Sequence, residues 1–323
     1  MVNNFIHTRF IVTIGTECDV PGFGIFEAIQ ECKDKIKIKK IHCKLFPEIS
    51  KYTPKFTGIT ICRKDIFVAG YSTIYKIDAQ DLKITAEITS PYFNDIHELS
   101  NDTEYIYVAN TGYSNIVRIP IQDLKENSSI PPLVCYGRDF PKYLIAKDTR
   151  NLMSNRIKDN NYMHLNSIEL CKNLILINDL DNGMIFLRKN GNYFIKSQAN
   201  PVSLRTHDIV ITNTQIVSTS VEGKLIFREL NSNTCKEYLI PKSIILHEGW
   251  CRGLMIVQNN WFFVGFTRFR NQNAAQRMRT SKSHIKYFQL GQKPIKVYLE
   301  QYFKKTITSI YQIKKVETKI WGD

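Results

Sequence analysis

Six short segments share one layout, and this repeat limits the fold more than any other feature of the sequence. Each ends on an aliphatic residue that opens an apolar or alternating run, and most are followed by a second strand-like run and a turn. The six are Thr57-Gly58-Ile59, His97-Glu98-Leu99, Asn166-Ser167-Ile168, His207-Asp208-Ile209, Arg252-Gly253-Leu254 and Thr308-Ser309-Ile310. Repeated groups of short strands predict an all-β fold, a β-propeller with six blades.

The two ends of the chain together supply the strands of one repeat unit. Three strand-like runs near the N-terminus, Phe10 to Ile14, Gly22 to Ile29 and Lys35 to Ile41, have no preceding segment of the repeat. The last segment, within Thr306 to Ile313, has almost nothing after it. We therefore predict that the C-terminal strand is the innermost strand of the N-terminal blade, which closes the ring without exposed edges.

One propeller domain is expected to span residues 1–323, with two polar excursions as loops. The first covers about 122–160 and contains one strand-like run, Leu133 to Tyr136, and the second covers about 268–286. Long loops in compact domains tend to be functional. No run of roughly 18 apolar residues is present, as a membrane span would require, and Met1 to Thr13 lacks a signal-peptide pattern. A cytoplasmic protein without a membrane partner is expected.

Composition narrows the classes of partner and site. The eight cysteines are scattered without paired spacing, so neither a zinc ribbon nor a disulfide framework is indicated. The net charge of +14 is compatible with nucleic-acid binding, but the basic residues are dispersed. The alternation Lys35-Ile36-Lys37-Ile38-Lys39 is typical of an edge strand with one solvated face, where lysines also oppose aggregation. We expect no specific nucleic-acid partner.

Polar residues occupy positions in the repeat where packing alone would favour small aliphatic ones. If the first residue of each segment faces the central channel, one ring is formed by Thr57, His97, Asn166, His207, Arg252 and Thr308. Because residues two apart in a strand point the same way, a second layer nearer the mouth contains Asp95, His164, Arg205 and Trp250. We expect Asn166, Arg205, Trp250 and Asp95 to contact a substrate.

His97, His164 and His207 come from three consecutive blades, which predicts a three-histidine metal site with an open coordination position. Zinc, iron or copper would suit such a site. The alternative is a water-filled channel lined by polar side chains that bind no metal. The regular strand register puts His164 about 6 to 7 Å above the other two, so a shared ion would require a bulge at Leu165-Asn166 or binding high in the funnel.

Two further residues have a catalytic and a structural interpretation. Arg252 presents a planar fork suited to a carboxylate, sulfate or phosphate, or else it forms a structural pair with Asp95 or Glu98. Tyr113 lies in a turn that could reach the mouth, where its phenol would serve as an acid or base, or else it packs.

Several motifs together resemble a family of uncharacterised bacterial propeller proteins with the pattern DxH…NTGFS…HLNG…RGL…VGLSRxR. The matching segments are Asp95-Ile96-His97, Asn110-Thr111-Gly112-Tyr113-Ser114, His164-Leu165-Asn166-Ser167, Arg252-Gly253-Leu254 and Val264-Gly265-Phe266-Thr267-Arg268-Phe269-Arg270. The chain departs from the pattern at Tyr113, Ser167 and Phe266-Thr267. The resemblance implies the propeller fold and no particular activity.

In architecture alone, the chain also resembles the peptidyl-hydroxyglycine lyases, six-bladed propellers with three histidines on zinc and an arginine and a tyrosine nearby. This likeness favours a metal-dependent enzyme that acts on a small molecule or modified peptide, with Arg252 holding the substrate's anion. A lyase, a hydrolase or an oxidase would fit. The alternative is a non-enzymatic scaffold that binds a protein or peptide partner through the loops at 122–160 and 268–286.

Overall fold

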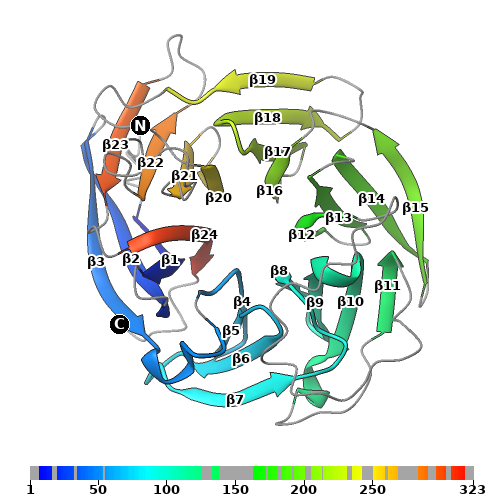
Figure 1. Ribbon diagram of the computed structural model, residues 1–323. Coiled ribbons are helices and arrows are strands. Elements are labelled where there is room, and N and C mark those ends of the chain that lie inside the picture. The colour runs from blue at the N-terminus through cyan, green and yellow to red at the C-terminus, as the bar shows by residue number, and fades with distance from the viewer. Residues whose placement is uncertain are drawn as a thin grey trace, which may run out of the picture.

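Six four-stranded antiparallel sheets stand around a central axis as the blades of a propeller (Figure 1). The computed structural model describes residues 7–16, 20–32, 35–53, 55–124, 133–137, 163–171, 174–180, 183–190, 193–200, 205–212, 214–230, 235–241, 250–258, 261–267, 283–289, 296–302 and 307–316. The all-β, six-bladed prediction is confirmed. Among these residues, no helix has the length and hydropathy needed to cross a bilayer.

Each blade runs from an inner strand at the axis to an outer strand at the rim. Blade 1 contains β4 (Gly58–Cys62), β5 (Asp65–Ala69), β6 (Thr73–Asp78) and β7 (Ile84–Thr89). Blade 2 contains β8 (Ile96–Asn101), β9 (Tyr105–Asn110), β10 (Asn115–Pro120) and β11 (Leu133–Gly137). Blade 3 contains β12 (Leu165–Cys171), β13 (Leu174–Asp179), β14 (Gly183–Asn190) and β15 (Tyr193–Asn200).

Blade 4 contains β16 (Thr206–Ile211), β17 (Gln215–Ser220), β18 (Lys224–Glu229) and β19 (Cys235–Leu239). Blade 5 contains β20 (Trp250–Gln258), β21 (Trp261–Thr267), β22 (His284–Gln289) and β23 (Lys296–Tyr302). Blade 6 contains β24 (Ile307–Val316), β1 (His7–Thr16), β2 (Pro21–Cys32) and β3 (Lys35–Leu45). Three short 3₁₀ helices lie in connections, namely η1 (Pro47–Ile49), η2 (Thr111–Tyr113) and η3 (Ile121–Asp123).

The ring is closed by the two ends of the chain, as predicted. β24 pairs antiparallel with β1, with Val316 opposite Arg9 and Ile307 opposite Thr16. In Figure 1 the red C-terminal strand accordingly lies beside the blue N-terminal strands. The outer strand β3 has the expected solvated face, because Lys37, Lys39 and Lys40 are exposed while Ile36 is buried.

Apolar side chains from both faces of each middle strand form the packing between neighbouring blades. In β9, for example, Val108 packs in a cluster with residues of blade 1, whereas Tyr107 packs in a cluster with residues of blade 3. A strand buried on both faces needs apolar residues at successive positions, which explains runs such as Ile66-Phe67-Val68-Ala69. The core is therefore a set of layers between blades, and the axis is left to the inner strands.

One part of the loop prediction is wrong. Leu133 to Tyr136 belongs to β11, which pairs with β10 as the outer strand of blade 2, and so it is not a strand inside a surface excursion. Most of the two predicted loops, about 122–160 and 268–286, lies outside the described residues. The exceptions besides β11 are residues 122–124 and the start of β22.

Candidate functional site at the channel

The ring residues occupy irregularities in four consecutive inner strands. The pairing of the inner strand with its neighbour skips His97 in β8, Asn166 in β12, His207-Asp208 in β16 and Arg252-Gly253 in β20. A β-bulge leaves its extra residue unpaired and turns the side chain out of the regular alternation. A bulge of the kind that a shared ion would require at Leu165-Asn166 is therefore present, as one of a set.

The residues of the mouth layer stand at the start of the inner strands. Asp95, His164 and Arg205 each come directly before an inner strand, and Trp250 is the first residue of β20. Asp95 has a φ of 48° and Arg205 a φ of 66°, so both have left-handed backbone. The Arg205 side chain is 57% exposed and lies 3.5 Å from Glu222, whereas Asp95 is buried.

Polar side chains on the inner strands satisfy the backbone N–H groups that face the axis. The innermost strand of a sheet has one edge without a strand partner, so its N–H groups need other acceptors. Glu98 Oε2 accepts from the Ile168 N–H of blade 3 (3.1 Å), and Asp208 Oδ2 accepts from the Gly253 N–H of blade 5 (2.8 Å). Gln312 of β24 accepts from the Ile59 N–H of blade 1.

Two of the ring residues also join adjacent blades. The Thr57 hydroxyl donates to the carbonyl of Ile96 in blade 2 (2.6 Å), and Asn166 Nδ2 donates to the carbonyl of Thr206 in blade 4 (3.2 Å). These contacts assign Thr57 a structural role and fix the amide orientation of Asn166. The side chain of Thr308 lies outside the described residues.

A partly buried charge cluster joins blades 2, 3 and 6 near the axis. Gln312 Nε2 donates to Glu98 Oε1, and Lys314 Nζ lies 3.3 Å from Glu169 Oε2 and 3.6 Å from Glu98 Oε1. Burial lowers the pKa of Lys314, but the carboxylates of Glu169 and Glu98 outweigh burial and hold that pKa above its ordinary value. Lys314 therefore stays charged and ties the three blades together.

His97 is held by residues on both of its ring nitrogens. Its Nδ1 donates to Asn166 Oδ1 (3.1 Å), since the Asn166 amide nitrogen is already directed at Thr206. Its Nε2 lies 3.5 Å from Asp95 Oδ1. The His164 ring packs edge-on against His97 with the centroids 4.9 Å apart, because the bulge in β12 brings the two layers together. These two histidines, Asp95 and Asn166 therefore lie together, and their predicted roles as metal ligands and substrate contacts stay predictions.

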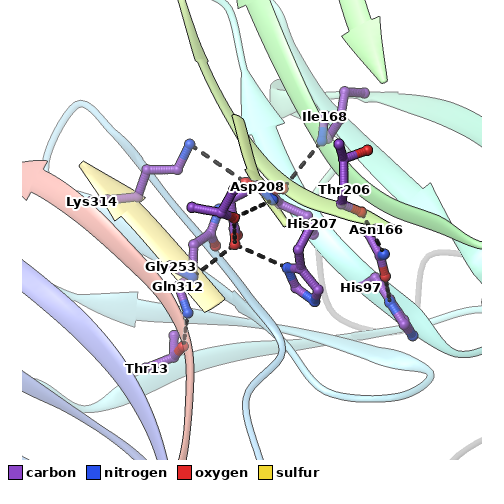
Figure 2. Close-up of polar contacts among 12 residues, drawn as sticks. Thr13, His97, Asn166, Ile168, Thr206, His207, Asp208, Gly253, Gln312 and Lys314 are labelled. Carbon is purple, nitrogen blue, oxygen red and sulfur yellow. Dashed lines mark hydrogen bonds and ion pairs between the residues drawn. The ribbon is translucent and has the colours of Figure 1, made fainter. Parts of the chain in front are cut away.

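His207 and Asp208 form a fixed pair in the bulge of β16. His207 Nδ1 donates to Asp208 Oδ2 at 3.0 Å, and Asp208 also accepts from the Thr219 hydroxyl (3.1 Å) and the Gly253 N–H (Figure 2). This bond directs the lone pair of the neutral ring to Nε2, which is buried and has no hydrogen-bond partner among the described residues.

The electrostatic surroundings favour the neutral form of His207. Burial lowers its pKa, the Asp208 carboxylate opposes this effect, and the guanidinium of Arg252 lowers the pKa further. The net result is a pKa below the ordinary histidine value. His207 is therefore a neutral imidazole with an unprotonated Nε2 at physiological pH.

Arg252 and Trp250 lie together on β20, next to the blade that carries His207. The Arg252 guanidinium stands over the Trp250 ring, 5.2 Å from its centroid, and Trp250 is 46% exposed. Such stacking holds the guanidinium plane in place while its edge remains suited to a planar anion. Glu98, one of the predicted structural partners of Arg252, is engaged by Gln312, Lys314 and Ile168.

Tyr113 occupies a packed turn. It lies in η2, is 9% exposed, and its hydroxyl donates to the Pro91 carbonyl at 3.1 Å. Burial raises the pKa of this phenol. These contacts favour the packing interpretation of Tyr113 over a role as acid or base.

The three predicted metal ligands do not form a metal-binding group in this structure. Across the described residues, no three His, Cys, Asp or Glu side chains are placed to hold one ion. His97 and His164 are neighbours, and Nδ1 of His97 is bonded to Asn166 and Nδ1 of His207 to Asp208, which leaves Nε2 of each of these two rings as the possible ligand atom. The three-histidine metal site stays a prediction.

Four residues of the channel were not predicted from the sequence, namely Glu98 as an acceptor, Asp208, Gln312 and Lys314. Asp208 follows a histidine directly, and residues adjacent in a regular strand point in opposite directions. The bulge makes the two side chains meet, and no sequence pattern indicated it. For Gln312 and Lys314, a signal was present, since residues at i and i+2 of a strand share one face and both of these are polar.

No protein-family model matches the chain, and no curated protein sequence is significantly similar to it. Solved structures do resemble it. A protein of unknown function from Bacteroides caccae has a TM-score of 0.61 and 10% identity, with 96% of this chain and 99% of that chain covered. A candidate 6-phosphogluconolactonase from Bacteroides fragilis has a TM-score of 0.54 and 12% identity, covering 98% of this chain and 99% of that one.

A chain in the structure of a nidogen/laminin complex has a TM-score of 0.59 and 10% identity, covering 95% of this chain and 98% of that chain. At identities this low, the similarity establishes the fold alone. It covers the whole length of the propeller, and the relatives include both a candidate enzyme and a protein in a complex. The function must therefore be argued from the channel.

Proposed function

We propose that the protein is an enzyme that acts by acid–base chemistry on a small anionic molecule at the channel. The observation that carries this proposal is the His207–Asp208 pair. A carboxylate on Nδ1 fixes the imidazole tautomer and stabilises the charge that appears when Nε2 takes a proton. Its pKa below the ordinary value keeps His207 in the basic form.

In this proposal, each predicted residue that surrounds His207 has a part. His207 Nε2 removes a proton from water or from the substrate, and Asp208 positions the ring. Arg252, held against Trp250, binds the substrate's anionic group. His97 and His164 supply polar contacts beside them, oriented by Asn166 and Asp95. Hydrolysis of an ester or lactone that carries a phosphate or carboxylate is the reaction class that fits.

A turnover screen with matched variants tests this proposal. The purified chain would be assayed with 6-phosphoglucono-δ-lactone, aryl phosphates, aryl sulfates and carboxylated aryl esters. For any substrate turned over, His207→Gln should abolish turnover and Asp208→Asn should lower kcat by about 10⁴-fold, as expected when the tautomer is wrong. The matched control is His42→Gln, which changes an exposed histidine on β3 and should leave the rate unchanged.

Arg252 supplies the binding test. Tryptophan fluorescence titrated with inorganic phosphate or sulfate should report binding through Trp250, and Arg252→Lys should weaken it, because an ammonium lacks the planar fork. Turnover that survives His207→Gln would rule out His207 as the base. A chain that turns over none of the panel and binds neither anion would instead favour the non-enzymatic scaffold.

A further inference from the structure

A group of polar side chains is buried between blades 3 and 4 without hydrogen-bond partners. Its members are Ser167 and Asn178 of blade 3, and Thr206 and Ser218 of blade 4. Ser167 is 1% exposed and the other three 0%. Both polar atoms of the Asn178 amide and the three hydroxyl oxygens have no partner among the described residues.

Strand alternation places all four side chains at the same interface. Leu176 and Met184 of blade 3 pack in one cluster with Ile209 and Ile216 of blade 4. Asn178 lies two residues after Leu176, and Ser218 two residues after Ile216, so each points in the same direction as the cluster residue before it.

The other two side chains follow from the pairing. Ser167 stands opposite Asn178 and shares its face of the sheet. Thr206 stands opposite Ser220, which lies two residues from Ser218. The four side chains therefore converge beside the hydrogen bond that joins Asn166 of blade 3 to Thr206 of blade 4, drawn in Figure 2.

Blades 1, 2 and 5 have no polar side chain at the equivalent positions. The residue equivalent to Ser218, opposite the aliphatic anchor of the inner strand, is Val68, Val108, Ile177 or Val264. The residue equivalent to Asn178 is Ala69, Ala109, Thr219 or Gly265. Apolar residues at these positions are therefore compatible with the same fold, and among the described residues only this interface combines a serine and an asparagine there.

Five buried polar atoms without hydrogen bonds would lower the free energy of unfolding substantially. Each buried polar group without a partner forfeits the hydrogen bonds that it makes with water in the unfolded chain. Together they would cancel much of the small net stability that a folded domain has. A guest that hydrogen-bonds to them removes this cost.

The chemistry of the five atoms identifies the guest. Asn178 Nδ2 is a donor only, its Oδ1 is an acceptor only, and the hydroxyls are both. A cation would leave Nδ2 unsatisfied, and none of the four side chains carries a charge to balance one. A guest that donates and accepts equally well is required.

We propose that this interface is a binding site for internal water, held by Ser167, Asn178, Thr206 and Ser218. About two molecules suffice, because a buried water makes about three hydrogen bonds. About six bonds give one partner to each N–H of Asn178 Nδ2, to its Oδ1 and to each of the three hydroxyls. The water joins β12, the inner strand of blade 3, to β16, the inner strand of blade 4. In β16, His207 directly follows Thr206. It sets the relative position of the two blades that supply Asn166 and His207.

A crystal structure of the full chain gives the direct test. Ordered water within hydrogen-bonding distance of at least two of the five atoms is expected. A dry interface in which Asn178 bonds directly to the hydroxyls would overturn the proposal. Density for an ion bound only by oxygens would also overturn it, as would a melting temperature that rises in sodium or potassium chloride relative to choline chloride.

A double-mutant cycle tests the shared water in solution. Asn178→Ala and Ser218→Val introduce the residues that blades 1 and 2 have at these positions, so the chain should still fold. Each single change should lower the melting temperature by a few degrees, because it strips hydrogen bonds from the same water. The double variant should lose less than the sum, since the guest and its partners disappear together.

The matched control combines Asn178→Ala with Val68→Ala in blade 1. These residues share no neighbour, so their shifts in melting temperature should add. Additive shifts for Asn178→Ala with Ser218→Val as well would contradict the proposal, because independent sites do not share a guest.

Discussion

His207 shows how a single residue acquires chemical character from its surroundings. Its carboxylate partner is the next residue in the chain, and a bulge in β16 allows the two side chains to meet. Asp208 is in turn fixed by the Gly253 N–H and the Thr219 hydroxyl. Gly253 has a φ of 79°, and an added Cβ would lie 2.9 Å from Ile313, so only glycine fits there.

The lowered pKa of His207 predicts a pH-dependent stability. The unfolded chain binds a proton on this residue as the pH falls below about 6.5, whereas the folded chain does not. The free energy of unfolding should therefore decrease from about pH 6.5 downward. His207→Gln should make this decrease smaller when urea unfolding is compared at pH 7.5 and 5.5. The exposed-site variant His42→Gln should keep the parent's decrease, and equal decreases in parent and His207→Gln would contradict the prediction.

Arg205 is a second residue whose backbone conformation has a measurable effect on stability. Its φ of 66° lies in the left-handed region, which an arginine adopts at a cost of about 1–2 kcal/mol. Arg205→Gly should raise the free energy of unfolding by about 0.5–1 kcal/mol, after the larger chain entropy of glycine is subtracted. Urea denaturation would measure this. The control Arg63→Gly relieves the same kind of strain, at φ 57°, in the turn after the inner strand β4, whereas Arg205 precedes its inner strand.

The outcome for Arg205 bears on its predicted role. If Arg205→Gly stabilises the chain but weakens binding of phosphate or sulfate, the arginine is retained for the site at the expense of stability. If Arg205→Gly destabilises the chain while Arg63→Gly stabilises it, the backbone strain at Arg205 has been misjudged.

At the level of elements, β24 contributes more than the closure of the ring. Its Gln312 accepts from the Ile59 N–H of blade 1 and donates to Glu98 of blade 2, while the Gln312 N–H donates to the Thr13 hydroxyl of β1 (2.9 Å). Lys314 adds ion pairs to blades 2 and 3. The C-terminal strand thus holds four blades at the axis.

Truncation after Lys305 should therefore open the propeller. The exposed edge of β1 and the unpaired Glu98 would favour association of chains and a lower, less cooperative melting transition. Light scattering coupled to size exclusion, together with calorimetry, would show both effects. A chain that ends at Val316 keeps β24 and should remain like the parent. A truncated chain that stays monomeric and melts as the parent does would disprove the closure.

The elements were more predictable from sequence than the site was. Strands can be recognised from short apolar runs such as Ile66-Phe67-Val68-Ala69 without knowledge of distant residues. The blades and the closure by the C-terminal strand could therefore be predicted. β11 was missed as a blade strand because it is half exposed and lies beyond a long polar segment. The positions of His97, Asn166 and His207 in the ring could be read from the repeat, because all three precede equivalent anchors.

The partners of those residues could not be predicted, because they depend on bulges and on contacts between distant blades. The Lys314 contact with Glu98 and the Gln312 contact with Ile59 join residues far apart in the chain. Local periodicity contains no information about which blades face each other across the axis. The regular alternation on which the two predicted layers were based also fails at the bulges, which is why His164 lies beside His97 and not a full layer above it.

Seen as a whole molecule, the channel has a structural part and a part suited to chemistry. Near the axis, Glu98, Gln312 and Lys314 satisfy backbone groups and one another's charges. His97, His164, His207, Arg252 and Trp250 come from blades 2 to 5. A ring of blades fixes these side chains against each other, because each inner strand is anchored by its own sheet.

The metal prediction belongs to this scale, because its three histidines come from three blades. In the geometry described above, Nε2 of His207 is unpartnered among the described residues, but no three such side chains there surround one point, so a shared ion would require the rings to turn or the blades to shift. We therefore expect purified chain to contain less than stoichiometric zinc, iron or copper by elemental analysis. We also expect His97→Ala, His164→Ala and His207→Ala to leave the metal content unchanged. Stoichiometric metal that is lost in all three variants would establish the three-histidine site and show that the ring rearranges to bind it.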